Sequence, residues 1–116
     1  MTEKIKGGCG SLKSRYMEKD RLLFIEITEE IDHHTTEEIR RKMDREMERC
    51  MPRKVIFDFS GVTFMDSAGI GLLLGRYRLA MLLGAKLNII HAQNSIKKIL
   101  EMSGILKIIP ILEEVG

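Results

Sequence analysis

The sequence predicts an α/β protein with one domain, in which α-helices pack against a single mixed β-sheet of four to five strands. Three observations support this class: a hairpin pattern opens the chain, strand and helix patterns then alternate, and one short apolar run is typical of a strand buried on both faces. The length of 116 residues suits one core and is too short for two ordinary domains. We expect residues 1–12 to be a flexible leader and residues 13–116 to form the domain.

A β-hairpin is predicted for residues 13–28, where two extended runs flank Lys19 and Asp20. The second run has an apolar residue at every second position, which is the period of a strand with one buried face. These apolar residues are Leu23, Ile25 and Ile27. The leader before the hairpin is predicted to be loose because it holds three glycines and little that can be buried.

The first helix is predicted to start at residues 34–36, where hydroxyl residues that cap helices precede two acidic residues of the first turn. Its apolar residues recur every four positions: Ile39, Met43 and Met47. On the outer face, Glu37 is spaced to pair with Arg41 and Glu38 with Lys42, each pair contributing about 0.2–0.5 kcal/mol. This charged face is expected to be solvated.

A central parallel strand is predicted at residues 55–59, after Pro52 has ended the first helix. The chain turns at residues 60–61. Asp66 and Ser67 then cap a second helix that ends at Gly84.

The remaining chain is predicted to add a strand at residues 86–91, a short helix capped by residues 94–95 and closed by Gly104, and an edge strand at residues 108–112. Methionines at helical spacing are expected to lie in the core rather than in an adaptable binding groove. They are Met43, Met47, Met65, Met81 and Met102.

Composition argues against several partner classes. Nineteen basic and seventeen acidic residues are intermixed and leave a net charge of +2, so nucleic acid is not favoured. Cys9 and Cys50 have no CxxC spacing, so we expect free thiols in a reducing compartment. The longest apolar stretch, residues 70–83, is interrupted and too short to cross a bilayer, and no signal-peptide pattern is visible. We therefore expect a cytoplasmic protein without a membrane partner.

Metal binding and catalysis are not favoured either. Four residues are candidate metal ligands: Asp32, His33, His34 and His91. They lack the HxH or HxxxH spacing of histidine pairs that chelate a metal. Adjacent Asp66 and Ser67 cannot supply the acid, base and nucleophile of a hydrolytic triad, and there is no GxSxG motif. The glycines of residues 69–75 do not follow GxGxxG, and the lysine of a P-loop is absent. We expect no metal, no cofactor and no enzymatic activity.

The most informative segment is residues 64–71, which place an acid, a hydroxyl and two glycines around a helix start. A helix N-terminus accepts anions, so it tolerates a phosphate on Ser67. Gly69 and Gly71 would leave the first turn bare for another protein to approach, and Asp66 could orient the hydroxyl. The alternative interpretation is that Asp66 or Ser67 only caps the helix and the glycines only permit packing. From the residues alone, both interpretations stay open.

Three motifs resemble one family. Ile-Asp-His-His-Thr at 31–35, Val-Thr-Phe-Met-Asp-Ser-Ala-Gly-Ile-Gly at 62–71 and Leu-Gly-Arg-Tyr at 74–77 strongly resemble the STAS-domain anti-sigma factor antagonists, also called anti-anti-sigma factors, of sporulation. Met-Ser-Gly-Ile at 102–105 also looks like that family. The resemblance covers about residues 13–111, with the motifs in matching order. It implies the STAS fold, a mixed sheet with helices packed on it.

The resemblance also implies a function. In that family, the unphosphorylated protein binds an anti-sigma factor that is a serine kinase with bound ADP or ATP, and the sigma factor is released. Phosphorylation of the serine that matches Ser67 ends this interaction, and a serine phosphatase restores it. Family members often have a second hydroxyl next to that serine, but this chain has Ala68, so Ser67 is the one acceptor in the motif.

The resemblance places a partner-binding surface on two segments. Its expected residues are Asp32, His33, His34, Thr35, Asp66, Ser67, Ala68, Gly69 and Gly71. For His34 and Thr35, a role as helix cap alone remains the alternative. We expect the free chain to be a monomer. The alternative function is a non-phosphorylated STAS scaffold module in a transporter or lipid-trafficking assembly.

Overall fold

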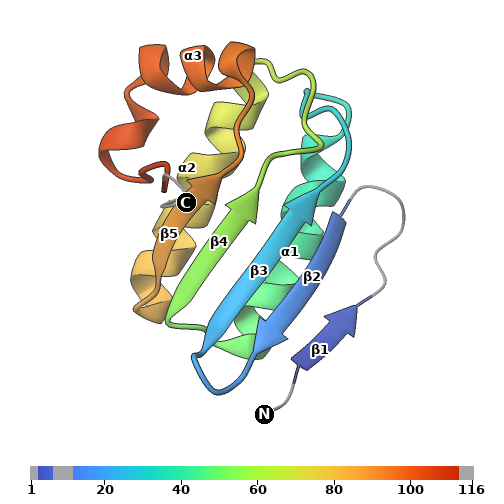
Figure 1. The fold of residues 1–116 in the computed structure, drawn as a ribbon, viewed down its shortest axis with the longest axis vertical. Coiled ribbons are helices and arrows are strands. Elements are labelled where there is room, and N and C mark those ends of the chain that lie inside the picture. Colours follow the sequence, from blue (N-terminus) through green and yellow to red (C-terminus); the bar gives the residue numbers. More distant parts are fainter. Residues whose placement is uncertain (1–2, 7–11, 113–116) are drawn as a thin grey trace.

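The computed structural model describes residues 3–6 and 12–112, which form a five-stranded sheet and its helices (Figure 1). Its elements in chain order are β1 (Glu3–Lys6), β2 (Leu12–Met17), β3 (Leu22–Ile27), α1 (Thr36–Cys50), β4 (Lys54–Asp58), α2 (Ser67–Leu83), β5 (Lys86–Ile90), α3 (Asn94–Ser103) and the 3₁₀ turn η1 (Ile105–Lys107). The spatial order of the strands is β1-β2-β3-β4-β5. The predicted α/β class and mixed sheet are confirmed.

The sheet combines two pairing modes. β1, β2 and β3 pair in antiparallel fashion, whereas β3, β4 and β5 are parallel. The predicted hairpin is therefore present as β2 and β3, and β4 is the central parallel strand that the apolar run indicated. Because β3, β4 and β5 are parallel, their carboxyl ends lie at the same edge of the sheet, where ligand and partner sites of such folds form.

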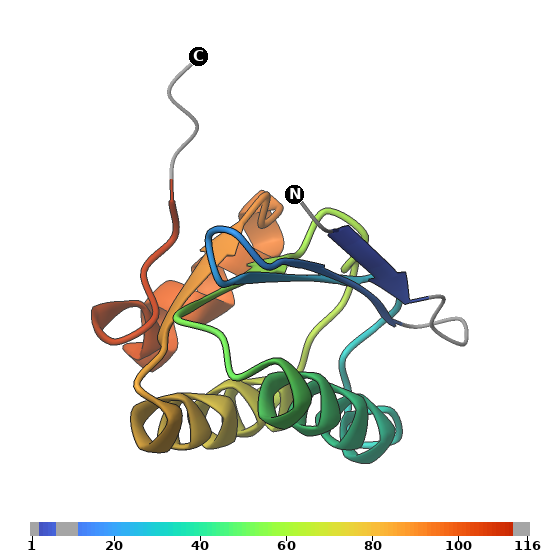
Figure 2. The same ribbon diagram turned by 90° about the horizontal axis from the view of Figure 1, so that it is seen from below.

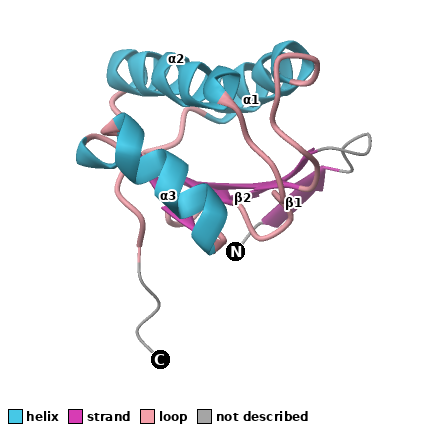
Figure 3. Cartoon of the chain, turned by 90° about the horizontal axis from the view of Figure 1, so that it is seen from above, coloured by secondary structure: helices cyan, strands magenta, loops and turns pink. Residues whose placement is uncertain are grey.

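The helices cover one face of the sheet. Figures 2 and 3, seen from opposite sides, show α1 and α2 side by side against that face. The helix α3 lies beside the carboxyl end of β5 (Figure 1). The predicted apolar residues of β3 and α1 are all fully buried between these layers. They are Leu23, Ile25, Ile27, Ile39, Met43 and Met47. Burial of this set is the main favourable term of folding.

Two expectations at the ends of the chain differ from the structure. Glu3–Lys6, expected to belong to a loose leader, forms the edge strand β1, because a short polar segment suffices when only one side must pair. Leu12, also in the predicted leader, is buried at the start of β2, and the remaining leader residues lie outside the described residues. The edge strand expected at residues 108–112 is reduced to one bridge between Ile111 and Ile89, since η1 precedes it and Pro110 has no N–H to donate.

The helices differ from prediction at their surfaces. Met43, Met47 and Met65 are buried as expected, but Met81 and Met102 are 64% and 82% exposed, so the prediction that they are core residues is wrong. In α2, Ala80 is buried, and Met81 follows it about 100° further around the helix, which turns its side chain toward solvent. Glu38 pairs with Lys42 as predicted, whereas Glu37 lies 3.7 Å from Arg40 rather than pairing with Arg41.

The capping of α3 also differs from prediction. Its N-cap is Gln93, and Asn94 is already helical, so residues 94–95 do not cap it. The predicted ends of α2 at Gly84 and of α3 at Gly104 are confirmed, and both glycines have positive φ.

An ion pair joins α1 to α2. The Arg76 Nε atom lies 2.8 Å from the Asp44 Oδ1 atom, and the Arg76 side chain is almost fully buried. Burial lowers the pKa of the Arg76 guanidinium, and the Asp44 carboxylate opposes that shift. Because a buried charge without its partner is costly, this pair fixes how α1 sits against α2.

We expect Asp44→Asn to lower the free energy of unfolding by about 2–3 kcal/mol, because it leaves a buried guanidinium without its countercharge. Urea unfolding followed by circular dichroism measures this change. Glu38→Gln is the matched control on the same helix, since Glu38 forms an exposed pair and its loss should cost less than about 0.5 kcal/mol. Equal effects of the two substitutions would contradict this assignment.

Candidate functional site

Two loops that are far apart in the sequence meet at the carboxyl edge of the sheet. Ile31, after β3, forms a parallel bridge with Met65, after β4. The Ile31 N–H donates to the Phe64 carbonyl at 3.0 Å, and the Asp66 N–H donates to the Ile31 carbonyl at 3.2 Å. Ile31 and Met65 are both buried. The two segments named by the motifs therefore form one surface, above the starts of α1 and α2 (Figure 1).

The start of α2 is capped by Asp66. One oxygen of its side chain, Oδ1, accepts the Ala68 N–H at 2.9 Å, and its backbone is extended as an N-cap requires. Ser67 is the first helical residue, and its side chain is exposed. Both interpretations of the motif are consistent with this geometry, because the capping oxygen comes from Asp66 and the Ser67 hydroxyl remains accessible.

The two glycines of the motif face opposite ways. Gly69 is buried, and a Cβ there would press against the Met65 side chain, 2.6 Å from its Sδ, and lie 3.2 Å from Ile31 Cγ2. Gly71 is exposed, and a Cβ there would meet no described atom within 4 Å. The expectation of a bare first turn therefore fits Gly71. Gly69 instead lets α2 approach the bridge between the loops.

The loop before α1 is held by its own side chains. The Asp32 Oδ1 atom accepts the His34 N–H at 2.8 Å and the Thr35 N–H at 3.1 Å. These two hydrogen bonds, with that of His34 foremost, hold the pKa of the Asp32 carboxyl below its usual range. The Thr35 hydroxyl accepts the Asp32 N–H at 3.0 Å and donates to the Glu30 carbonyl at 2.9 Å.

These contacts limit the helix-cap interpretation of Thr35. The residue occupies the N-cap position of α1, but its hydroxyl makes no capping bond and turns back into the loop. His34 is exposed in the preceding turn. These hydrogen bonds hold the backbone of the loop, and the imidazoles of His33 and His34 lie at the surface.

A groove runs between the first turns of α1 and α2. Its volume is about 460 Å³, and it is lined by His33, Thr36, Glu37, Arg40, Ala68, Gly71 and Leu72. The His33 Nδ1 atom lies 3.6 Å from the Asp66 Oδ2 atom, which links the two walls at one end. Thr36, Glu37, Arg40 and Leu72 were not among the predicted site residues. Thr36 and Glu37 lie in the first turn of α1, and Arg40 follows them at the spacing of four and three residues that places side chains on one helix face.

The expected residues lie together, with one exception. Asp32, His33, His34, Thr35, Asp66, Ser67, Ala68 and Gly71 are wholly or partly exposed around the groove and its two loops, whereas Gly69 is buried. His91 lies elsewhere, with its Nδ1 atom 3.2 Å from the Asp58 Oδ1 atom. Among residues 3–6 and 12–112, no cluster of three metal-ligating side chains is present.

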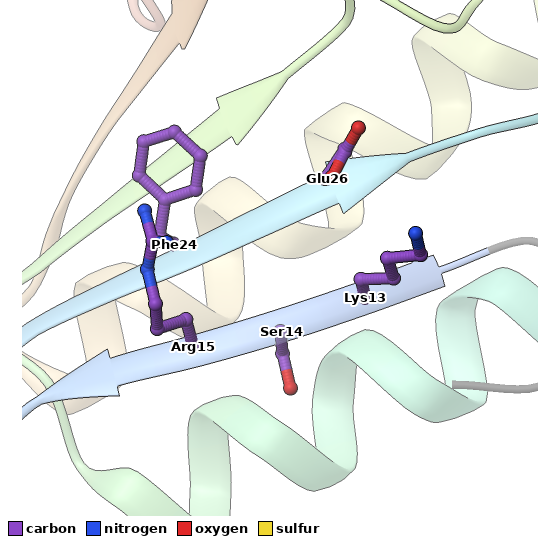
Figure 4. A pocket seen from close by; sticks show the side chains of 5 residues that line it. All are labelled: Lys13, Ser14, Arg15, Phe24 and Glu26. Atoms are coloured by element: carbon purple, nitrogen blue, oxygen red, sulfur yellow. The ribbon is translucent and has the colours of Figure 1, made fainter. Parts of the chain in front are cut away.

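A smaller cavity lies on the face of the sheet opposite α1 and α2 (Figure 4). It has a volume of about 130 Å³, and the guanidinium of Arg15 stacks 5.2 Å from the centre of the Phe24 ring. Lys13 and Glu26 flank it. It is separate from the groove and shares no residue with it.

Comparison with known proteins identifies the class. The family model described as the STAS domain matches residues 14–116. An anti-sigma F factor antagonist of Paenibacillus polymyxa is 34% identical over 92 residues, 79% of this chain and 79% of that protein. The chain belongs to the STAS family as an anti-sigma factor antagonist, and it is a regulatory protein rather than an enzyme.

Solved structures share the fold. The anti-sigma factor antagonist SpoIIAA in its unphosphorylated form has a TM-score of 0.71 and 24% identity, covering 97% of this chain and 90% of that one. The Bacillus cell fate determinant SpoIIAA in its phosphorylated form has a TM-score of 0.63 and 24% identity, covering 97% and 93%. In the part of this chain that the structure describes, no helix has the length and apolar character needed to cross a membrane.

We expect Gly69→Ala to lower the free energy of unfolding by about 1–3 kcal/mol, because the methyl group must displace buried Met65. Thermal unfolding followed by circular dichroism measures the loss. Gly75→Ala, at an unobstructed position of the same helix, is the control and should raise stability by up to about 1 kcal/mol. A neutral Gly69→Ala would mean that the bridge does not limit the approach of α2.

Proposed function

We propose that this chain is a phosphorylation-controlled antagonist of an anti-sigma factor that is itself a serine kinase, and that Ser67 is the phosphorylated residue. The observation that carries the proposal is the exposed Ser67 side chain at the start of α2, where Asp66 already supplies the cap. The name of the Paenibacillus relative and the two forms in which SpoIIAA was solved support the same mechanism. The protein acts in the cytoplasm.

The unphosphorylated surface binds the kinase. The rigid loop of residues 32–35 and the first turn of α2 form adjoining parts of one surface, so recognition and presentation of the hydroxyl use the same contacts. The kinase with its bound ADP or ATP engages this surface and releases the sigma factor. Gly71 leaves the groove wall without a side chain, which lets the partner approach the helix closely.

Phosphorylation changes the charge of the surface. In the transfer, the Ser67 oxygen bonds to the terminal phosphorus of ATP, its proton passes to a base of the kinase, and ADP leaves. The added charge of about −1.5 to −2 is accommodated at the N-terminus of α2 but repels the nucleotide phosphates of the kinase. Binding is lost without refolding, and hydrolysis of the phosphoserine by a serine phosphatase restores it.

We expect the serine-kinase anti-sigma factor encoded in the same genome to add one phosphoryl group from ATP to the purified chain, at Ser67. Intact-mass spectrometry and peptide mapping measure the product. Ser67→Ala should remain unmodified, while Ser60→Ala, which removes another exposed serine from the preceding loop, should be modified normally. Modification of Ser67→Ala at the normal level would overturn the assignment.

The same kinase should bind Ser67→Ala about as tightly as the original chain, but Ser67→Asp at least about tenfold more weakly, a loss of about 1.4 kcal/mol. Titration calorimetry with ADP present measures both affinities. Ser67→Asn separates charge from size and should retain most of the affinity. Equal binding of Ser67→Asp and the original chain would contradict repulsion and favour a scaffold module that is not switched by phosphate.

Gly71→Ala tests the close approach of the partner. The methyl group projects into the groove without touching this chain, so stability should stay the same or rise by up to about 1 kcal/mol. Kinase binding should weaken by about tenfold or more. Gly75→Ala is the control one turn further along α2, outside the groove lining, and should bind normally. Normal binding of Gly71→Ala would place the contact elsewhere.

A further inference from the structure

His33 and Asp66 face each other across the two loops of the site. The His33 Nδ1 atom lies 3.6 Å from Asp66 Oδ2, while the other oxygen of Asp66 accepts the Ala68 N–H. The His33 side chain is 72% exposed and that of Asp66 is 32% exposed. The imidazole can therefore exchange protons with solvent and can adjust its position next to the residue that precedes Ser67.

The other charged groups around His33 are already engaged. The His34 ring stacks on it at 4.0 Å between centroids, and His34 Nδ1 lies 3.9 Å from Asp32 Oδ1. Along the groove wall, the Arg40 guanidinium lies between two carboxylates, 3.7 Å from Glu37 and 3.7 Å from Asp44. On the opposite wall, at the start of α2, the Asp66 carboxylate lies next to His33. Among the described groove residues, His33 is thus the basic group that reaches across to α2.

A phosphate on Ser67 would bring a second anion to this contact. Consecutive Cα atoms are about 3.8 Å apart, so the phosphate and the Asp66 carboxylate would both lie within about one Debye length of the imidazole. A phosphoserine loses its second proton near pH 6, in the range where imidazoles gain theirs. A protonated His33 would offset one unit of the combined negative charge of the Asp66 carboxylate and the phosphate.

We propose that His33 is the intramolecular counter-charge of phosphorylated Ser67 and holds the phosphate beside the start of α2. This inference rests on the proposed phosphorylation of Ser67. His33 acts here as a positioning residue: it takes up a proton from solvent, and no bond to phosphorus forms or breaks.

The test measures the phosphate itself and needs no kinase. Phosphoserine is inserted at position 67 during translation through a reassigned stop codon, in the otherwise unchanged chain and in His33→Gln and His34→Gln. Phosphorus NMR at low salt then follows the second ionisation of the phosphate against pH. The His33 imidazolium favours the dianion, so His33→Gln should move the ionisation midpoint upward by about 0.5 unit.

His34→Gln is the matched control, because it removes the neighbouring imidazole that lies beside Asp32 instead of Asp66. It should move the midpoint by less than half as much, and 1 M salt should shrink the His33 effect. Circular dichroism checks that all three proteins are folded. Equal midpoints in His33→Gln and the unchanged chain, or an equal shift in His34→Gln, would overturn the inference.

The outcomes separate this inference from the proposed function. A kinase that modifies another residue would overturn the switch at Ser67, but the ionisation midpoints would still report whether His33 and a phosphate at position 67 interact. Conversely, the kinase could modify Ser67 while His33→Gln leaves the ionisation midpoint of the phosphate unchanged. That result would support the proposed switch and show that His33 is not the counter-charge of the phosphate.

Discussion

The bridge between Ile31 and Met65 is the constraint on which the functional surface depends. Its two hydrogen bonds join the loop after β3 to the loop after β4, and both side chains are buried beneath the surface. Without it, His33 and Ser67 would belong to independent loops. Because the bridge joins the two loops, the first turns of α1 and α2 lie next to each other, and a groove forms between them. The bare position at Gly69 is needed because α2 begins directly against this bridge.

Asp66 and Ser67 have different roles at the start of α2. The Asp66 side chain accepts a hydrogen bond from the Ala68 N–H and so caps the helix. The Ser67 side chain is not needed as the cap and is exposed. In the proposed transfer, the Ser67 hydroxyl is the substrate, while the base and the nucleotide belong to the partner. The Arg76–Asp44 pair joins the two helices that carry the groove walls.

Local sequence patterns predicted most of the fold. The period of two in β3, the period of four in α1 and the apolar run in β4 were each sufficient, because each reports which faces of an element are buried. The patterns were less reliable where burial depends on distant elements. Met81 and Met102 fit helical spacing yet face solvent, and β1 has too little apolar character to be recognised before its pairing with β2 is known.

By itself, the sequence determined the class of the fold, the ends of α2 and α3 at Gly84 and Gly104, and the identity of the segment that carries Ser67, because turns and periodic burial are local properties. Resemblance to a family supplied the expectation that residues 32–35 belong with that segment. Only the tertiary structure decided that Asp66 is the cap, that Gly69 is internal while Gly71 is exposed, and that His33 reaches Asp66. These contacts arise because the parallel strands β3 and β4 bring the two loops to the same edge of the sheet. A local sequence pattern carries no information about the distance between residues that are far apart in the chain.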